Sequence, residues 1–257
     1  MAKSVYIGVQ NTAKHVGAIY IGVAGTARKV VKGYVGVYGM AMEFFSSDPV
    51  LIFETSTPGT YSQPLAAGKY EITLIGGGGG AAGARSTAVN NHHYAQGGVG
   101  GTLQVIAKLN AAATVSIVVG AGGSTANGTF ASAGTTVTGT AGGLSKITGF
   151  GDLTAQAGGG TGATIRSSST SACSRTVGKI GTNTISGSCL VETLIDNPTA
   201  ITSLQSTSTG TSRTATGREN TNWPEDPKRG QGGDSGWRST SFLTMHGSSG
   251  FVRIRKL

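Results

Sequence analysis

The sequence predicts an all-β fold: N-terminal β-hairpin repeats followed by a glycine-rich β-sandwich with polyglycine-II-like segments. Three observations support this prediction. A 14-residue unit recurs three times near the N-terminus. Beyond it, stretches rich in β-branched residues are bordered by runs of glycine, which supplies 44 of the 257 residues. Charged residues make up 12% of the chain, about half the usual share, so we expect few helices.

The repeat occupies the first 45 residues. Tyr6, Tyr20 and Tyr34 each begin a Tyr-Ile-Gly-Val or Tyr-Val-Gly-Val stretch. Each unit has two β-prone stretches around a tight turn, as in a β-hairpin. Because one small hairpin cannot bury an apolar face, residues 1–45 are interpreted as an attachment or oligomerisation module. A plain β-extension of the next domain is the alternative. The candidate docking residues are Tyr6, Tyr20, Tyr34, Arg28, Lys29, Phe44 and Phe45.

The net charge of +9 is unevenly distributed. Residues 1–42 contain five lysines and arginines and no carboxylate. This balance favours an acidic partner, although solvated strand faces explain it equally well. Nucleic acid is not expected as a partner, because the basic residues lack interleaved aromatic side chains and a recognition-helix pattern.

Residues 46–257 form the predicted glycine-rich domain. Thr57 to Thr60 and Ala67 to Lys69 are predicted turns. The four residues between 102–109 and 114–119 predict that these two strands form a hairpin. The predicted strands are 50–54, 70–75, 102–109, 114–119, 145–148, 153–157 and 250–256.

Glycine runs recur at the ends of these strands. They follow Ile75, Val119 and Ala157 and precede Thr102. Glycine lacks Cβ, so its backbone can pack against backbone in three-residue-per-turn polyproline-II-like helices. We therefore predict a bundle of glycine helices at one end of the sandwich; flexible glycine loops are the alternative. The predicted structural glycines are Gly76, Gly78, Gly80, Gly98, Gly101, Gly122 and Gly159.

The stretch YEITLIGGGGGAAGAR also has the beginning of a dinucleotide-binding turn. That site needs a following helix and an acidic residue about 20 positions later. No helical spacing of apolar residues follows Gly80, and the next carboxylate is Asp152. We therefore expect no nucleotide and no other cofactor.

Several segments resemble a known family: YEITLIGGGGG, GGVGGTLQVIAKL, TVSIVVGAGG, LTAQAGGGTG and the closing SSGFVRIRKL. Together they resemble the glycine-rich domain of tail fibres, tail-tip proteins and adhesins of tailed bacteriophages. The resemblance implies a polyglycine-II core whose connecting loops touch the host receptor. The Tyr-Ile-Gly-Val repeat is similar to N-terminal repeats of structural proteins in phages of Gram-positive bacteria.

Residues 163–229 depart from the family pattern as a long Ser/Thr-rich insertion, predicted to be a small subdomain or a binding excursion. Cys189 to Ile195 is a candidate extra strand within it. The sequence leaves a disulfide between Cys173 and Cys189 open. Aromatic and amide side chains on loops suit binding of sugars or proteins. The candidate receptor-contact residues are Asn91, His92, His93, Tyr94, Trp223, Trp237 and Arg238.

The leading hypothesis is a non-enzymatic virion protein, assembled in the host cytoplasm, that acts as a tail fibre or tail-tip component. Residues 1–45 would bind other virion proteins, and the chain would form a homo-oligomer, with a trimer favoured. The remainder would present loops to a bacterial surface polysaccharide or protein receptor. The alternative is a capsid decoration or head-fibre protein with a purely architectural role.

A carbohydrate-active tail-spike enzyme is the third hypothesis, and it requires two carboxylates that meet in a groove. The 11 acidic residues show no such pair, so we expect no enzyme. The four histidines and two cysteines have no metal-ligand spacing, so we expect no metal site. No apolar run approaches the roughly 20 residues of a membrane span, and no membrane insertion is expected.

Overall fold

The computed structural model describes residues 6–9, 12–15, 20–23, 26–30, 32–37, 40–46, 49–88, 92–196, 207–208, 212–213, 230–238 and 241–257. For β1–β6 and β22–β25 it describes the backbone path alone. The described residues form strands and no helix, so the all-β prediction is confirmed. No helix in this part of the chain is long and apolar enough to cross a membrane. The chain divides into two units, Met1–Ile52 with Arg255–Leu257, and Phe53–Ile254.

The first unit contains three two-stranded antiparallel sheets. In each, the final valine of the first strand pairs with the first residue of the second: Val9 with Thr12, Val23 with Thr26, and Val37 with Met40. A two-residue separation of this kind is the shortest hairpin connection. The strands are β1 (Tyr6–Val9), β2 (Thr12–His15), β3 (Tyr20–Val23), β4 (Thr26–Lys29), β5 (Lys32–Val37) and β6 (Met40–Ser46).

Two five-stranded sheets form the sandwich. The β9 sheet has the order β21 (Leu190–Asp196), β12 (Thr102–Leu109), β9 (Gly68–Ile75), β26 (Phe251–Lys256) and β7 (Val50–Thr55). The β13 sheet has the order β20 (Thr184–Ser186), β17 (Leu153–Ala157), β16 (Ser145–Phe150), β13 (Ala113–Val119) and β8 (Gly59–Leu65).

Alternating apolar side chains from both sheets fill the sandwich core. Ile72 and Leu74 of β9 and Ile117 of β13 are fully buried. The Tyr70 ring lies edge-on against Phe150 of the other sheet, with centroids 5.6 Å apart. Its hydroxyl donates a 2.7 Å hydrogen bond to the Ala66 carbonyl, so burying this polar group leaves it satisfied.

The predicted hairpin of strands 102–109 and 114–119 is wrong. β12 pairs with β9 and β21, whereas β13 pairs with β8 and β16, so the connection between β12 and β13 crosses from one sheet to the other. Val105 and Ile117 both point into the core from opposite sheets. A connection this short is compatible with a hairpin and with a crossing between sheets. In both arrangements the glycine runs of the two strands lie at the same end of the sandwich.

The two predicted turns also need correction, because Gly59 begins β8 and Gly68 begins β9. β8 was not among the predicted strands. Its sequence contains Pro64, and proline within a sheet is confined to edge strands, first strand residues and bulges. The structure places β8 at the edge of its sheet, where Pro64 pairs only with Thr114 of β13.

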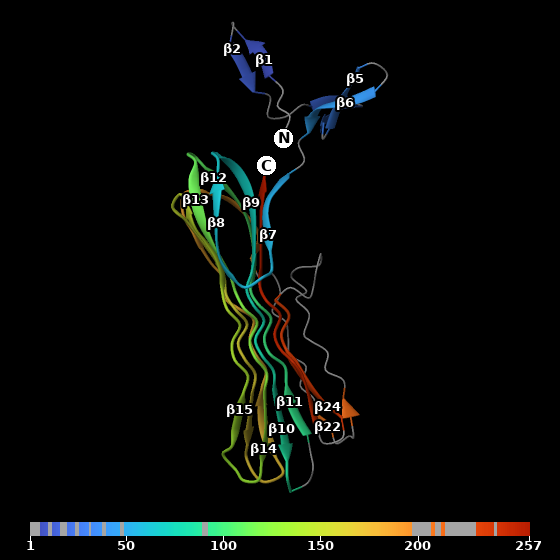
Figure 1. The fold of residues 1–257 in the computed structure, drawn as a ribbon, viewed down its shortest axis with the longest axis vertical. Helices are drawn as coiled ribbons and strands as arrows, with labels where there is room; N and C mark the ends of the chain where they lie inside the picture. The colour runs from blue at the N-terminus through green and yellow to red at the C-terminus, as the bar shows by residue number, and fades with distance from the viewer. Residues whose placement is uncertain are drawn as a thin grey trace. The chain divides into compact units, whose positions relative to one another are not determined.

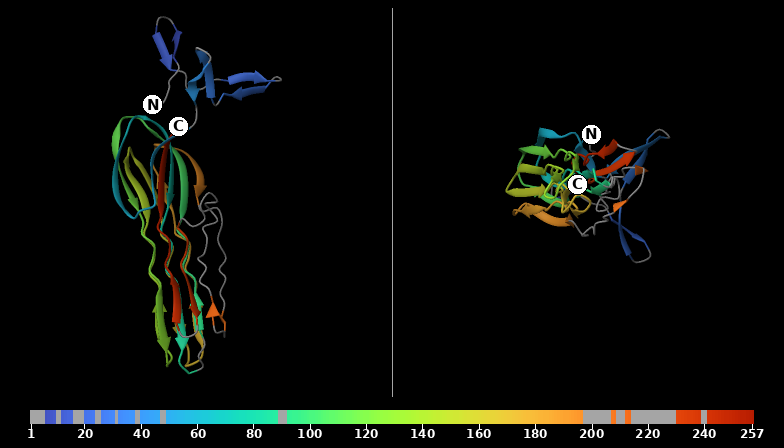
Figure 2. Two further views of the ribbon diagram at one scale, coloured as in Figure 1. Left: turned by 45° about the vertical axis from the view of Figure 1, so that its right-hand side comes forward. Right: turned by 90° about the horizontal axis from the view of Figure 1, so that it is seen from below.

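Beyond the sandwich, eight glycine segments run side by side and lead into three further sheets (Figures 1 and 2). We call these the distal sheets. The first has the order β14 (Ala126–Phe130), β10 (Ala82–Ser86), β11 (His92–Ala95) and β22 (Thr207–Ser208), with β10 and β14 parallel. The second is β15 (Thr136–Thr138), β18 (Thr164–Ser167) and β19 (Cys173–Thr176). The third is β23 (Ser212–Arg213), β24 (Asp234–Arg238) and β25 (Ser241–Met245).

The glycine segments are held together by backbone hydrogen bonds. Segment 76–81 lies at the centre and is hydrogen-bonded to six others. These six also bond to one another in a closed ring, in the order 96–101, 158–163, 139–144, 120–125, 246–250 and 230–233, and then back to 96–101. The eighth segment, 177–183, lies outside this ring against 96–101 and 158–163.

The central segment shows a three-residue period. Gly76 and Gly79 donate to segment 96–101, Gly77 and Gly80 donate to 139–144, and Gly78 donates to 246–250. Since a polyproline-II helix has three residues per turn, each residue faces a different neighbour. Positions 76–80, which are enclosed on every side, therefore need glycine, which explains the five consecutive glycines.

The predicted structural glycines all lie in this bundle. A Cβ on six of them, Gly76, Gly78, Gly80, Gly98, Gly122 and Gly159, would overlap a backbone carbonyl of another segment. A Cβ on Gly101 would overlap the side chain of Asn183. The bundle was expected at one end of the sandwich, whereas its segments continue into the distal sheets.

The predicted insertion does not begin at residue 163. Residues 164–196 contribute strands β18 to β21 to the distal and sandwich sheets, and 177–183 is a glycine segment. The candidate strand Cys189 to Ile195 corresponds to β21. Segment 177–183 was not predicted as a glycine segment because it contains only two glycines. These two, Gly178 and Gly181, occupy its close contacts with other segments.

Replacing Gly78 with alanine tests the bundle. The new Cβ would overlap the Gln231 carbonyl, so we expect Gly78→Ala to lower the free energy of unfolding by about 3 kcal/mol or more. Gly128→Ala is the matched control, because the nearest atom to its Cβ is a side-chain methyl of Val137. Urea unfolding followed by circular dichroism measures both changes, and equal losses in the two variants would contradict the packing described here.

Candidate functional site

The turns that close the distal sheets form the candidate functional site. We call residues 87–88, 131–135 and 168–172 the tip turns. They contain alanine, serine, threonine and glycine, and most of their residues are exposed. These turns were not among the predicted contact segments, although clusters of Ser, Thr and Gly between strands are the ordinary turn signal.

Two buried serines fix the tip turns. The Ser167 hydroxyl, at the end of β18, donates to the Ser132 carbonyl at 2.8 Å and accepts from the Thr135 amide at 2.9 Å. The Ser86 hydroxyl, at the end of β10, donates to the Thr170 carbonyl. Each serine thus ties a turn to a strand that is distant in sequence. Nothing in the local sequence distinguishes these serines from the many exposed ones.

Further hydrogen bonds shape each turn. The Ala172 amide donates to the Ser169 hydroxyl at 3.0 Å, and the Ser168 amide donates to the Ala172 carbonyl at 2.9 Å. Gly134 has a φ of +90°, a backbone conformation that favours glycine. The turns are therefore ordered before any partner binds, which lowers the entropic cost of binding.

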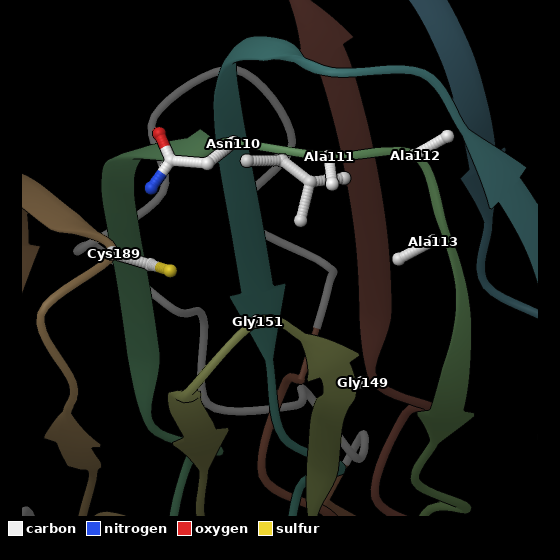
Figure 3. Close-up of a pocket in the computed structure, with 8 residues that line it drawn as sticks. Asn110, Ala111, Ala112, Ala113, Gly149, Gly151 and Cys189 are labelled. Atoms are coloured by element: carbon white, nitrogen blue, oxygen red, sulfur yellow. The ribbon is translucent and has the colours of Figure 1, made fainter.

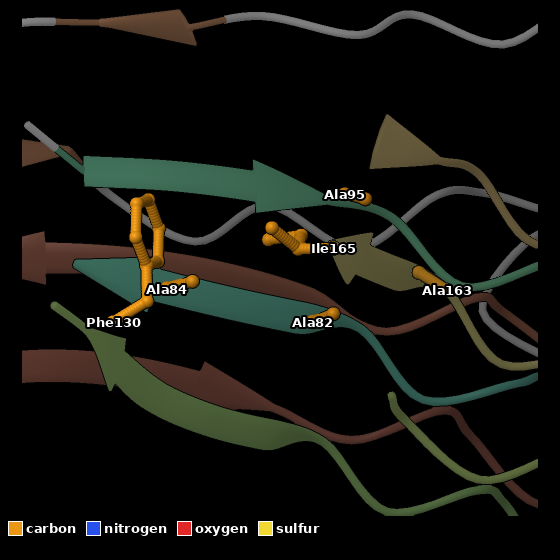
Figure 4. Packing of buried hydrophobic residues seen from close by; sticks show 6 residues of the cluster. All are labelled: Ala82, Ala84, Ala95, Phe130, Ala163 and Ile165. Carbon is orange, nitrogen blue, oxygen red and sulfur yellow. The ribbon is translucent and has the colours of Figure 1, made fainter. Parts of the chain in front are cut away.

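A small apolar core supports the tip turns (Figure 4). Phe130 and Ile165 are its two large side chains, and alanines supply the rest. Small side chains let the distal sheets approach closely, which continues the tight packing of the glycine bundle. The cluster consists of Ala82, Ala84, Ala95, Phe130, Ala163 and Ile165, with Val137 and Cys173 packed against it.

The predicted contact residues His92, His93 and Tyr94 are buried. They lie on β11, where their exposed fractions are 2%, 4% and 4%. The His93 ring packs against Phe130 with centroids 5.6 Å apart. These three residues therefore stabilise the distal sheets and are not surface contacts. The prediction failed because a polar run between glycines was read as a loop, whereas β11 is covered on both faces.

Burial and charge both act on the buried imidazoles. Burial, and then the positive charges of Arg175 and His92, hold the pKa of His93 below its usual value. Burial, and then Arg85, similarly lower the pKa of His92. Neither ring nitrogen of His93 hydrogen-bonds to a residue in the described part of the chain. The neutral form is therefore the one that suits the fold.

Four other predicted contact residues do not meet at a described site. Asn91 and Trp223 lie outside the described residues. Trp237 and Arg238 lie on β24, where Trp237 pairs with Phe242 and Arg238 with Ser241.

The predicted docking residues lie on the hairpins of the first unit, whose backbone alone is described. They are Tyr6 on β1, Tyr20 on β3, Arg28 and Lys29 on β4, Tyr34 on β5, and Phe44 and Phe45 on β6.

The two cysteines are free and far apart. Cys173 lies in a distal sheet and Cys189 lies just before β21 of the sandwich, with segment 177–183 between them. Seven residues at about 3.1 Å each span about 20 Å, well beyond the roughly 7 Å limit for a disulfide. No disulfide joins them within this fold.

A pocket of about 310 Å³ opens in the sandwich between the two sheets (Figure 3). Its lining is Leu109, Asn110, Ala111, Ala112, Ala113, Gly149, Gly151 and Cys189. Asp152, next to this lining, accepts hydrogen bonds from the Ser188 and Cys189 amides at 2.8 and 3.0 Å. Hydrogen bonds from the Cys189 side chain and from Ser188 hold the pKa of Asp152 well below its usual range. The Asp152 carboxylate thus fixes the turn that precedes β21. The pocket lining contains one side-chain amide, that of Asn110, and one thiol, that of Cys189.

No group of three His, Cys, Asp or Glu residues that could hold a metal ion occurs among the described residues.

The buried histidines make stability depend on pH. Because the folded state holds the pKa of His93 below its usual 6.5, the unfolded chain takes up protons more readily. Stability is fully present above about pH 6.5 and decreases as the pH falls below that value. We expect the melting temperature to fall between about pH 7 and pH 5, and to fall less in a His92→Gln, His93→Gln variant. Thermal unfolding at each pH measures this, and equal falls in both chains would exclude the histidines as the cause.

No protein-family model matches the chain, and no curated protein matches it.

Proposed function

We propose that the chain is a non-enzymatic structural protein of a bacteriophage particle, a tail fibre or tail-tip component that presents the tip turns to the host surface. The observation that carries this proposal is the preordered set of exposed tip turns at the end of a hydrogen-bonded glycine bundle. A backbone-only bundle is a stiff support, and small polar turns offer adaptable hydrogen bonds to a sugar or protein surface.

The bundle also bears on assembly. Its ring closes within one chain, so the glycine segments need no second copy to satisfy their packing. We therefore assign oligomerisation, as a trimer or another homo-oligomer, and attachment to other virion proteins to the hairpins of residues 1–45. Two-stranded hairpins need a further surface to be stable, which is consistent with that role.

A capsid decoration or head-fibre protein is the second candidate. The absence of carboxylates from residues 1–42, which carry five basic residues, favours docking onto an acidic shell. Immunogold labelling of the producing particle with an antibody against residues 163–229 separates the candidates. Label on the tail supports the fibre role, and label over the head supports the decoration role.

Charge insertion at the tip turns tests the host-binding role. Ala133 and Ser171 are exposed, so Ala133→Glu with Ser171→Glu adds unpaired charges without disturbing the buried serines. We expect the affinity of the full-length chain for host cells to fall by about tenfold or more. Flow cytometry with fluorescently labelled protein measures it.

The control for this experiment is Thr114→Glu with Thr148→Glu, two exposed positions on the outer face of the β13 sheet. We expect the control to change affinity less than about twofold. Equal binding by the tip variant and the unmodified chain would show that the tip turns are not the contact surface.

A further inference from the structure

The outer face of the second distal sheet carries two rows of polar side chains. One row is Thr136, Arg166 and Ser174, which face each other across β15, β18 and β19. The neighbouring row is Thr138, Thr164 and Thr176, in the same register. The Thr138 and Thr164 hydroxyl oxygens are 3.2 Å apart, so they share a hydrogen bond. Arg166 is therefore flanked by hydroxyl groups on both sides and along its own strand.

A second cation extends this face. Lys179 is exposed on the glycine segment that follows β19, and its amide donates a 2.7 Å hydrogen bond to the Thr161 hydroxyl. The Lys179 backbone thus lies beside Thr161, and five residues of extended chain, from Thr161 to Arg166, separate the two positions along the backbone by about 16 Å. We call this surface the Arg166–Lys179 strip.

Both cations lack an acidic partner among the residues that the structure describes. Neither Arg166 nor Lys179 forms an ion pair with any residue in the described part of the chain. Moreover, segments 76–101, 120–144 and 158–183 contain no Asp or Glu. The positive potential of Arg166 and Lys179 is therefore not cancelled by carboxylates within these segments.

A second hydroxyl-rich face in the described part of the chain differs in charge. The outer face of the β13 sheet carries Ser116 and Thr148 in register, but its lysine, Lys146, is half-buried. Asp152 is exposed at the turn after β16, and its lowered pKa keeps it ionised. Threonine is common on exposed strands, so hydroxyl groups alone indicate nothing. Exposed cations among hydroxyls, without acids, distinguish the Arg166–Lys179 strip.

We propose that the Arg166–Lys179 strip binds an extended phosphate-bearing glycopolymer. The planar guanidinium of Arg166 suits two-pronged hydrogen bonding to a phosphate, and Lys179 supplies a second point charge for a phosphate further along the polymer. The hydroxyl groups beside Arg166, and those of the neighbouring threonine row, hydrogen-bond to the hydroxyl groups of the polymer. The strip adjoins the tip turns. This proposal rests on the proposed host-surface role, for which it names the class of receptor.

The test measures binding of synthetic poly(glycerol phosphate) to the full-length chain by biolayer interferometry. We expect Arg166→Gln with Lys179→Gln to weaken binding by about tenfold or more, since two charged contacts are lost. Thr138→Val with Thr164→Val keeps the shape and β-propensity of the sheet while removing hydroxyls. We expect this variant to weaken binding by about threefold.

The matched control removes the same charge elsewhere. Lys69 and Lys108 are exposed and pair across β9 and β12 of the sandwich, so Lys69→Gln with Lys108→Gln lowers the net charge equally. We expect the control to change affinity less than about twofold. Equal weakening in both double-charge variants would show binding to net charge alone and would overturn the proposal, as would no binding of the polymer.

Host-cell binding by the same proteins separates this proposal from the proposed function. Cell binding without polymer binding would overturn the glycopolymer assignment and leave the host-surface role in place. Polymer binding that depends on the strip, without cell binding, would uphold the assignment and contradict the host-surface role. Melting temperatures of all variants check that the substitutions leave the fold intact.

Discussion

The structure depends on the enclosure of segment 76–81 by six other stretches of the same chain. Its amides and carbonyls point in three directions per turn, and each direction is occupied by another backbone. The closeness of this packing leaves no volume for a Cβ. The amides of Gly76 to Gly80 and the carbonyls of Gly77 to Gly80 form hydrogen bonds to neighbouring segments, so these buried peptide groups are satisfied. Glycine is required there for its absent side chain, and positive φ is not the reason, since none of these residues has one.

The second unit consequently has two side-chain cores separated by a region with almost none. The sandwich core contains large residues such as Tyr70, Phe150 and Leu74. The distal core is mostly alanine around Phe130 and Ile165. Between the two cores, hydrogen bonds between peptide groups hold the segments together. Each contributes about 1 kcal/mol net to stability, and these contributions add up only while the segments stay in register. The size of the distal side chains follows from this spacing, because strands that leave a tightly packed bundle begin too close together to accommodate larger ones.

The sequence predicted most of the sandwich strands, because β-branched residues and flanking glycines mark them, but β8 and β20 were not among them. Strands 102–109 and 153–157 were predicted with their observed bounds. Pairing was less predictable, since the β12–β13 connection is equally compatible with a hairpin and with a crossing between sheets. The distal strands were not predicted because their sequences have little β-propensity, as in AGARS of β10 and ANGTF of β14. They form strands because the glycine segments before them place them side by side. The tip turns carry an ordinary turn signal, but the sequence does not show that Ser86 and Ser167 fix them, because the partners of these serines are far away in sequence.

The closed ring has a consequence for how the protein is made. The central segment emerges from the ribosome early, whereas two of its six neighbours, 230–233 and 246–250, are synthesised last. Segment 76–81 therefore cannot be enclosed until nearly the whole chain has been synthesised, and its peptide groups stay hydrated until then. Such long sequence separations predict slow folding. A run of glycine tolerates that delay well, because it exposes no apolar side chain to other nascent chains while its neighbours are still absent.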